Sequence, residues 1–138
     1  MIETARAHEW LYQILVNDAT LNSFVGGRVY RRLAPPASVM PYLIFQYQAG
    51  RDVQAVGPYR IMSSLVYVVK VVGLATSYAT LKTIADRIDV LLQAASGATA
   101  DGRVLSCVRE SAIDYEEEDA GVRYQHLGGQ YRLYVQPA

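Results

Sequence analysis

The chain has 138 residues, which is enough for one domain with a hydrophobic core, and we expect residues 1–138 to form a single domain. Its hydrophobic fraction of 51% and charged fraction of 19% are those of a folded protein and exclude a disordered one. The 13 basic and 13 acidic side chains cancel, so the net charge gives no case for nucleic-acid affinity.

Cysteine content and the length of apolar stretches limit the class of protein further. The single Cys107 excludes an internal disulfide and a metal cluster built from cysteines, and we expect it to be a small buried hydrophobe. The first residues show neither the basic start nor the apolar run of a signal peptide. No stretch approaches ~20 consecutive apolar residues. We therefore expect no membrane contact and a chain that folds in the cytoplasm.

The first third of the chain predicts two helices and a short strand. Apolar residues recur at helical spacing over residues 3–16 and indicate one amphipathic helix. Asp18 is a good N-cap for a second, short helix, which Gly26 favours ending. A short strand is predicted at residues 29–32. Three prolines, the last of them Pro41, then predict an extended loop.

Two strand patterns follow. Residues 42–50 alternate in polarity and predict a strand, and residues 51–58 predict a protruding loop or hairpin tip. Residues 59–73 give the longest strand pattern, and both of its faces are apolar. One core in a chain of this size covers only one of these faces. The other needs a second cover, for which a neighbouring subunit is a natural candidate.

The second half predicts one strong helix and two closing strands. Apolar residues at 78–95 follow a 3.6-residue repeat, with Thr76 or Ser77 as the cap. Residues 97–102 predict a surface loop. The strands are predicted at 103–115 and 122–135.

The last strand contains Gly128 and Gly129, which indicate a β-bulge or a close approach of another backbone. Together the elements predict the α+β class: an antiparallel β-sheet with two main helices packed on one face.

The sequence offers few groups for catalysis. Tyr78 and Lys82 have the spacing of the Tyr-x-x-x-Lys pair of short-chain dehydrogenases, but no dinucleotide-binding glycine motif precedes them. His8 and His126 are the only histidines, and His8 is expected to face solvent. We assign no catalytic, cofactor-binding or metal-binding residue. The alternative is a small α+β enzyme or ligand-binding domain with a pocket around Tyr124 and His126.

Tyrosine and acidic residues suggest contacts with other proteins instead. The chain has 11 tyrosines against 2 phenylalanines, and tyrosine is enriched at protein interfaces. The acidic run consists of Glu116, Glu117, Glu118 and Asp119. Such a run is usually a solvated turn. Alternatively, it forms an acidic edge that meets arginines of a neighbouring copy, with Arg31, Arg32, Arg51 and Arg60 as the candidates.

Several short motifs occur in an order that resembles the phage tail-completion (tail terminator) family. Residues 11–21 look like its first helix followed by an Asp-x-x-Leu turn, and Val25-Gly26-Gly27-Arg28-Val29-Tyr30 looks like its Val-Gly-x-Arg-Val-Tyr stretch. Pro41-Tyr42-Leu43-Ile44-Phe45 is similar to its Pro-Tyr strand start. Tyr115, His126 and Tyr131-Arg132-Leu133 are similar to its closing β segment.

This resemblance implies a structural virion protein that is assembled in the host cytoplasm. Members of the family close the head-proximal end of the tail tube as a ring, which implies a homohexamer here. The implied partners are further copies of the chain, the tail tube protein and the head-completion or connector protein. DNA would pass the channel without sequence-specific binding, and no cofactor is implied.

The protruding segments are the candidate interface, because loops on a rigid sheet are where recognition is usually placed. The residues assigned to it are Arg51, Asp52, Tyr59, Glu116, Glu117, Glu118 and Asp119.

Overall fold

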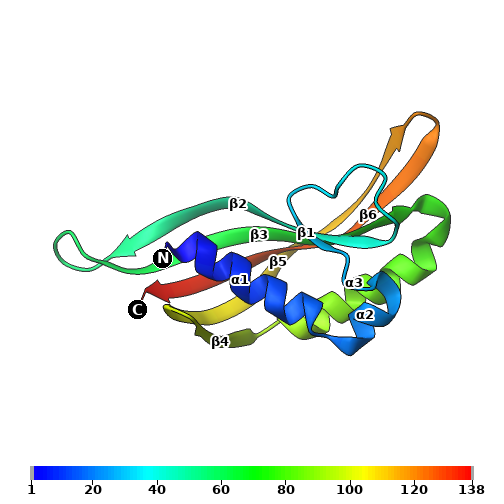
Figure 1. The fold of residues 1–138 in the computed structure, drawn as a ribbon. Helices are drawn as coiled ribbons and strands as arrows, with labels where there is room; N and C mark the ends of the chain where they lie inside the picture. Colours follow the sequence, from blue (N-terminus) through cyan, green and yellow to red (C-terminus); the bar gives the residue numbers. More distant parts are fainter. Residues whose placement is uncertain (1, 138) are drawn as a thin grey trace.

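The structure is a computed structural model that describes residues 2–137 of the chain (Figure 1). Its helices and strands confirm the predicted α+β class. In chain order they are α1 (Glu3–Val16), α2 (Ala19–Val25), β1 (Val29–Arg31), β2 (Tyr42–Gln54), β3 (Arg60–Leu74), the 3₁₀ turn η1 (Ala75–Ser77), α3 (Tyr78–Leu92), β4 (Ala95–Thr99), β5 (Gly102–Asp119) and β6 (Val122–Pro137).

The strands form one six-stranded sheet in the order β1-β2-β3-β6-β5-β4. The pairs among β2 to β6 are antiparallel, but β1 is parallel to β2, with Val29 opposite Leu43. The sheet is therefore mixed, and the prediction of a purely antiparallel sheet is wrong for β1. Parallel neighbours need a crossover connection. The loop of residues 32–41 supplies it and carries the chain back to the start of β2.

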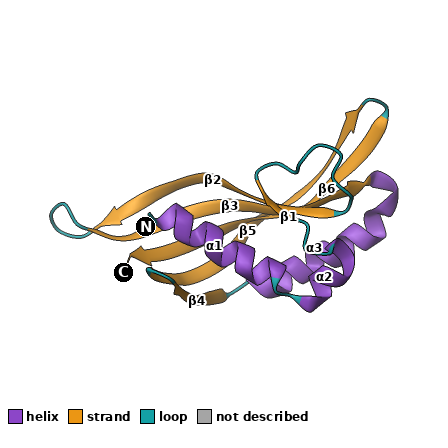
Figure 2. Cartoon of the chain, viewed as in Figure 1, coloured by secondary structure: helices purple, strands orange, loops and turns teal. Residues whose placement is uncertain are grey.

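A single apolar cluster joins helices and sheet. It contains the buried stripe of α1, represented by Leu11 and Leu15, and the buried stripe of α3, represented by Leu81 and Ile88. Alternate residues of β3, such as Val69, belong to the same cluster. All three helices lie along one side of the sheet (Figure 2).

The other face of β3 is less exposed than its sequence suggests. Val72 and Val68 point away from the helix-side cluster, yet they are only 2% and 8% exposed. Ile44 of the neighbouring β2 is also buried. The 32–41 loop arches over this side of the sheet (Figure 1). Part of the second cover expected from a neighbouring subunit is therefore supplied by the chain itself.

Three segments differ from their predicted form. The sequence predicts a loop at residues 97–102, but β4 reaches into this segment and pairs with β5. Strand β2 continues to Gln54, and β5 continues through the acidic run to Asp119. In each case pairing with a neighbouring strand overrides weak local propensity.

The paired glycines of β6 have the predicted close backbone approach. A Cβ on Gly128 would overlap the carbonyl oxygen of Val69, so no other residue fits there without a shift of the backbone. The irregular pairings lie on the facing strand β5, one of them between Arg109 and Ser111.

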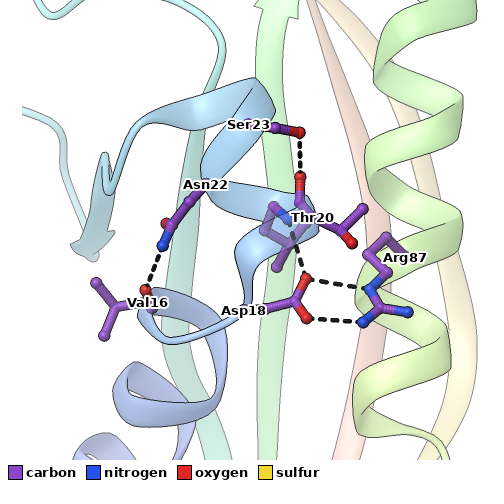
Figure 3. Close-up of polar contacts among 7 residues, drawn as sticks. Val16, Asp18, Thr20, Asn22, Ser23 and Arg87 are labelled. Carbon is purple, nitrogen blue, oxygen red and sulfur yellow. Dashed lines mark hydrogen bonds and ion pairs between the residues drawn. The ribbon is translucent and has the colours of Figure 1, made fainter.

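Asp18 joins the short helix α2 to α3 (Figure 3). One carboxylate oxygen accepts the Leu21 backbone N–H at 2.9 Å, which confirms the predicted N-cap. The same carboxylate accepts two hydrogen bonds from Arg87 of α3, at 2.7 and 3.1 Å. The Arg87 hydrogen bond is the main reason why the pKa of Asp18 lies below its usual value.

Asp18→Ala is expected to lower the free energy of unfolding by about 2 kcal/mol at pH 7, because it removes both a cap and a partly buried ion pair. A carboxyl with a lowered pKa stabilises the fold above its unfolded pKa of about 3.9, and this contribution is lost as the pH falls further. The difference between variant and parent should therefore shrink below pH ~4. Urea unfolding measures it. Asp86→Ala, in the exposed pair with Lys82, is the control and should change the stability far less.

Candidate functional site

Two hairpins extend from the sheet toward opposite ends of the molecule (Figure 1). The β2–β3 hairpin turns at residues 55–59, where the Ala55 N–H donates to the Tyr59 carbonyl oxygen at 2.8 Å. The β5–β6 hairpin turns at Ala120 and Gly121, both of which have positive φ. The residues assigned to the candidate interface all lie on these two hairpins. Most of them belong to the strands of the hairpins and not to the turns.

Arg51 and Asp52 belong to β2, so the predicted loop or hairpin tip begins only after Gln54, and its predicted start at residue 51 is wrong. Asp52 accepts a 2.7 Å hydrogen bond from Ser63 on β3 and lies 3.7 Å from Arg60. Arg60 in turn binds Glu3 at 3.0 Å, which ties the hairpin to the start of α1. Arg51 is exposed and makes no ion pair within residues 2–137.

The end of the β2–β3 hairpin carries exposed apolar side chains. Tyr59 is 73% exposed, Val56 is fully exposed and Ile61 is about half exposed. Exposed apolar groups that gather in one place are typical of contact surfaces.

The acidic run is an extended strand and not a turn. Glu116, Glu117, Glu118 and Asp119 pair with residues 122–125 of β6. Glu117 lies 2.7 Å from the Nε2 atom of His126. The other three carboxylates have no polar partner within the described part of the chain and are exposed. Three free negative charges therefore lie at the tip of this hairpin.

His126 is held in a cluster of side chains. Its ring stacks on Tyr115 with centroids 4.4 Å apart and an interplanar angle of 7°. Lys70 donates a 2.9 Å hydrogen bond to the Tyr115 hydroxyl oxygen. Burial is the main cause that lowers the pKa of His126, the nearby Lys70 charge acts in the same direction, and the Glu117 hydrogen bond opposes both. The cluster fixes the hairpin on the sheet.

A groove of about 510 Å³ lies beside this cluster, between the 32–41 loop and the β5–β6 hairpin. Tyr42, Tyr124 and the carboxylates of the hairpin tip line it. His126 does not line it, so the structure does not bring Tyr124 and His126 into one pocket. Within residues 2–137 no group of three His, Cys, Asp or Glu side chains is arranged to hold a metal ion.

Tyr78 and Lys82 also form no proton-transfer pair. The Tyr78 hydroxyl donates to Asp114 at 3.2 Å, and Lys82 donates to Asp86 at 3.0 Å. These hydrogen bonds raise the pKa of both groups, whereas the dehydrogenase chemistry needs a tyrosine of lowered pKa. Cys107 is buried as expected, and burial raises the pKa of its thiol to about 12.

The prediction that His8 faces solvent is wrong. Its ring packs edge-on against Tyr67, with centroids 5.4 Å apart, and against Phe45 on the helix side of the sheet. Burial and then the nearby charges of Arg31 and Arg32 lower the pKa of His8.

The chain should therefore lose stability as the pH falls from 7 to 5.5. Both histidines have pKa values below 6.5, so the unfolded chain binds more protons than the folded one in this range. Denaturant unfolding at the two pH values measures the loss. His8→Phe keeps the ring packing and should make the pH dependence shallower. An unchanged slope in that variant would contradict the assignment to His8.

Two long strand edges are bare, which the sequence did not reveal. On one side of the sheet β1 covers β2 only at residues 43–45, so the outer edge of β2 at 46–54 has no partner strand within residues 2–137. On the other side β4 covers β5 at 102–107, and the Gln93 side chain accepts the Arg109 N–H. The outer edge of β5 at residues 110–119 likewise has no partner strand within the described residues. Unpaired edges of this kind are templates for pairing with another chain.

Exposed hairpins, bare strand edges and the lack of a catalytic arrangement in residues 2–137 are features of an assembly protein. Comparison with known proteins identifies the family to which this assembly protein belongs. The family model described as "Tail completion protein gp17" matches residues 9–136, so the chain belongs to this family of tail completion proteins. The resemblance seen in the sequence is confirmed.

Seven chains of solved structures match, and one of them is a chain of the "Virion of native gene transfer agent (GTA) particle". That chain is 23% identical, with a TM-score of 0.75 over 97% of each chain. At this identity the likeness shows a shared fold. No curated protein matches the chain significantly.

The family membership settles the class of activity. The chain is a structural protein of the virion tail and not an enzyme, so the enzyme alternative around Tyr124 and His126 is wrong. Among the described residues, no helix is both long and apolar enough to cross a membrane.

Proposed function

We propose that this chain is the tail terminator. It forms a homohexameric ring that caps the head-proximal end of the tail tube and joins the tube to the head connector. The observation that carries this proposal is the pair of hairpins at opposite ends of a tail-completion fold (Figure 1). Each hairpin has exposed groups that no part of residues 2–137 engages.

The two hairpins differ in chemistry, which suits contacts with different partners. The β2–β3 tip presents Val56 and Tyr59, whereas the β5–β6 tip presents Glu116, Glu118 and Asp119. One tip would therefore bind through apolar burial and the other through charge. The zero net charge of the chain suits a channel that DNA passes without being held.

Virus particles made without this protein test the proposal. We expect overlong or uncapped tails and separate, filled heads in electron micrographs, and addition of the purified protein should restore joining. Native mass spectrometry of the protein released from tails should give a six-copy species. Tails of normal length that join heads in its absence would overturn the terminator role.

A further inference from the structure

The bare edges of β2 and β5 point to one occupant, the next copy of this chain. We propose that residues 46–54 of one copy pair with residues 110–117 of its neighbour as antiparallel strands, which joins the sheets of adjacent copies. The inference rests on the proposed ring and names the contact that would close it.

Strand direction fits this pairing. Along the sheet β2, β3, β6 and β5 alternate in direction, so β5 of one copy runs antiparallel to β2 of an identically oriented neighbour. A head-to-tail contact, in which identical subunits meet through two different surfaces, is what generates a ring.

The short strands at the two edges fit it as well. Strand β1 covers the beginning of β2, and β4 covers the beginning of β5, so the bare segments lie at diagonally opposite corners of the sheet. When they pair, β4 lies past the β2–β3 tip of the neighbour. The neighbour's β1 then lies at the β5–β6 tip. β4 does not obstruct the contact, and the end of β1 limits the pairing to position 117, because β1 already pairs with β2 at residues 43–45.

The side-chain faces restrict the register. Arg51 lies opposite Ser64 on the sheet face away from the helices, and Ile113 lies opposite Gly128 on the same face. A continuous sheet keeps each face continuous, so Arg51 must oppose Ser111 or Ile113 and never Ala112. Full pairing of the two bare segments favours Ile113.

The stagger that results is compatible with a closed sheet. Within one copy Gly50 of β2 pairs with Leu65 of β3, and Leu65 pairs with Leu133 of β6, so Gly50 and Leu133 lie at the same height along the strands. In the proposed register Gly50 meets the neighbour's position 114, which is level with Leu127, six residues away on β6. That is a step of about 20 Å along the strands for four strands about 19 Å wide. The strand tilt is then roughly 45°, within the usual range for closed sheets.

Charge is complementary where the contact meets β1. Residues 46–54 carry one arginine and one aspartate, whereas residues 28–32 carry three arginines, and residues 110–119 carry six carboxylates and no base. The proposed register brings the tip with Glu118 and Asp119 beside β1, where Arg31 and Arg32 are exposed and make no ion pair within residues 2–137. Such complementarity sets the register and disfavours wrong pairings.

Engineered cysteines test the pairing in assembled tails, where Cys107 is buried and does not interfere. Arg51→Cys combined with Ile113→Cys, or with Ser111→Cys for a two-residue slip, should give disulfide-linked ladders of up to six copies after mild oxidation. Arg51→Cys with Ala112→Cys is the matched control, because the two side chains lie on opposite faces. It should give much less of the linked product.

The outcomes separate this inference from the proposed function. Linked product in the Ile113 or Ser111 variant, with little in the Ala112 variant, supports the strand pairing. A six-copy ring in tails that links in neither variant, or equally in all three, overturns the pairing and leaves the terminator role standing. Tails that contain no ring of this chain overturn both.

Discussion

Reversing the charge at the β5–β6 tip is expected to abolish ring closure and, with it, the joining of tails to heads. The variant replaces Glu118 and Asp119 by Lys. Both side chains are exposed and have no polar partner within residues 2–137, so the free energy of unfolding should change by under ~0.5 kcal/mol. In the proposed contact the new lysines face Arg31 and Arg32 of the next copy. Like charges brought together at an interface cost several kcal/mol, so infectivity should fall at least ~100-fold.

The same contact predicts a rescue. Adding Arg31→Glu and Arg32→Glu to the chain restores opposite charges across the interface and should recover most of the lost infectivity. Glu9→Lys, an exposed charge reversal on α1, serves as the control and should leave infectivity unchanged. Plaque titres and micrographs of tails measure both effects. Full infectivity of the Glu118→Lys, Asp119→Lys variant would show that this tip is not at a contact between copies.

Much of the helical part of this fold could be predicted from the sequence, because its signals are local. Asp18 has a side chain that caps a helix, and Gly26 adopts the left-handed conformation that ends one. The apolar repeat of residues 78–95 predicts α3 with its buried face. Its first member, Tyr78, is nevertheless exposed, since it lies at the start of the helix and binds Asp114 across to β5.

The strands were harder to predict because their limits depend on partners elsewhere in the chain. Nothing near Ala95 indicates a strand, and β4 exists because β5 offers it a ladder. The acidic run resembles a turn by composition, yet β6 holds it extended. The parallel pairing of β1 depends on the path of the 32–41 loop, which no local pattern encodes.

In the candidate site, too, local features could be predicted from the sequence, whereas features that depend on distant parts of the chain could not. Exposed residues of unusual type, such as Tyr59 and the run at 116–119, could be found by composition. The bare edges of β2 and β5 could not, since an edge is defined by the absence of a neighbour along the whole sheet. The orientation of His8 could not be predicted either, because its helix position borders the apolar stripe and only the packing against Phe45 shows which way the ring points.

Removing the apolar groups at the β2–β3 tip is expected to separate ring formation from docking. Val56→Asp with Tyr59→Ser takes away two exposed side chains that pack on no core of this chain. Folding and the contacts of β2 should be unaffected, because Arg60 still binds Glu3 and Asp52 still accepts from Ser63. The ring should therefore form.

The ring of this variant should fail to bind the tail tube or the head connector, whichever of the two the β2–β3 tip contacts. A buried tyrosine at the centre of an interface contributes about 2–4 kcal/mol, so the affinity should fall by roughly 30- to 1000-fold. Binding of the variant to purified tail tubes and to connector-bearing heads identifies the partner that the tip contacts. Val90→Asp, which changes an exposed apolar residue on α3, is the control and should bind both normally. If the double variant binds both partners as tightly as the parent, the tip faces solvent in the assembled tail, and the apolar docking surface must lie elsewhere on the ring. If the same two changes, made in the Arg51→Cys, Ile113→Cys variant, also prevent its disulfide linkage, the tip acts within the ring, because the same hairpin carries the strand that pairs with the next copy.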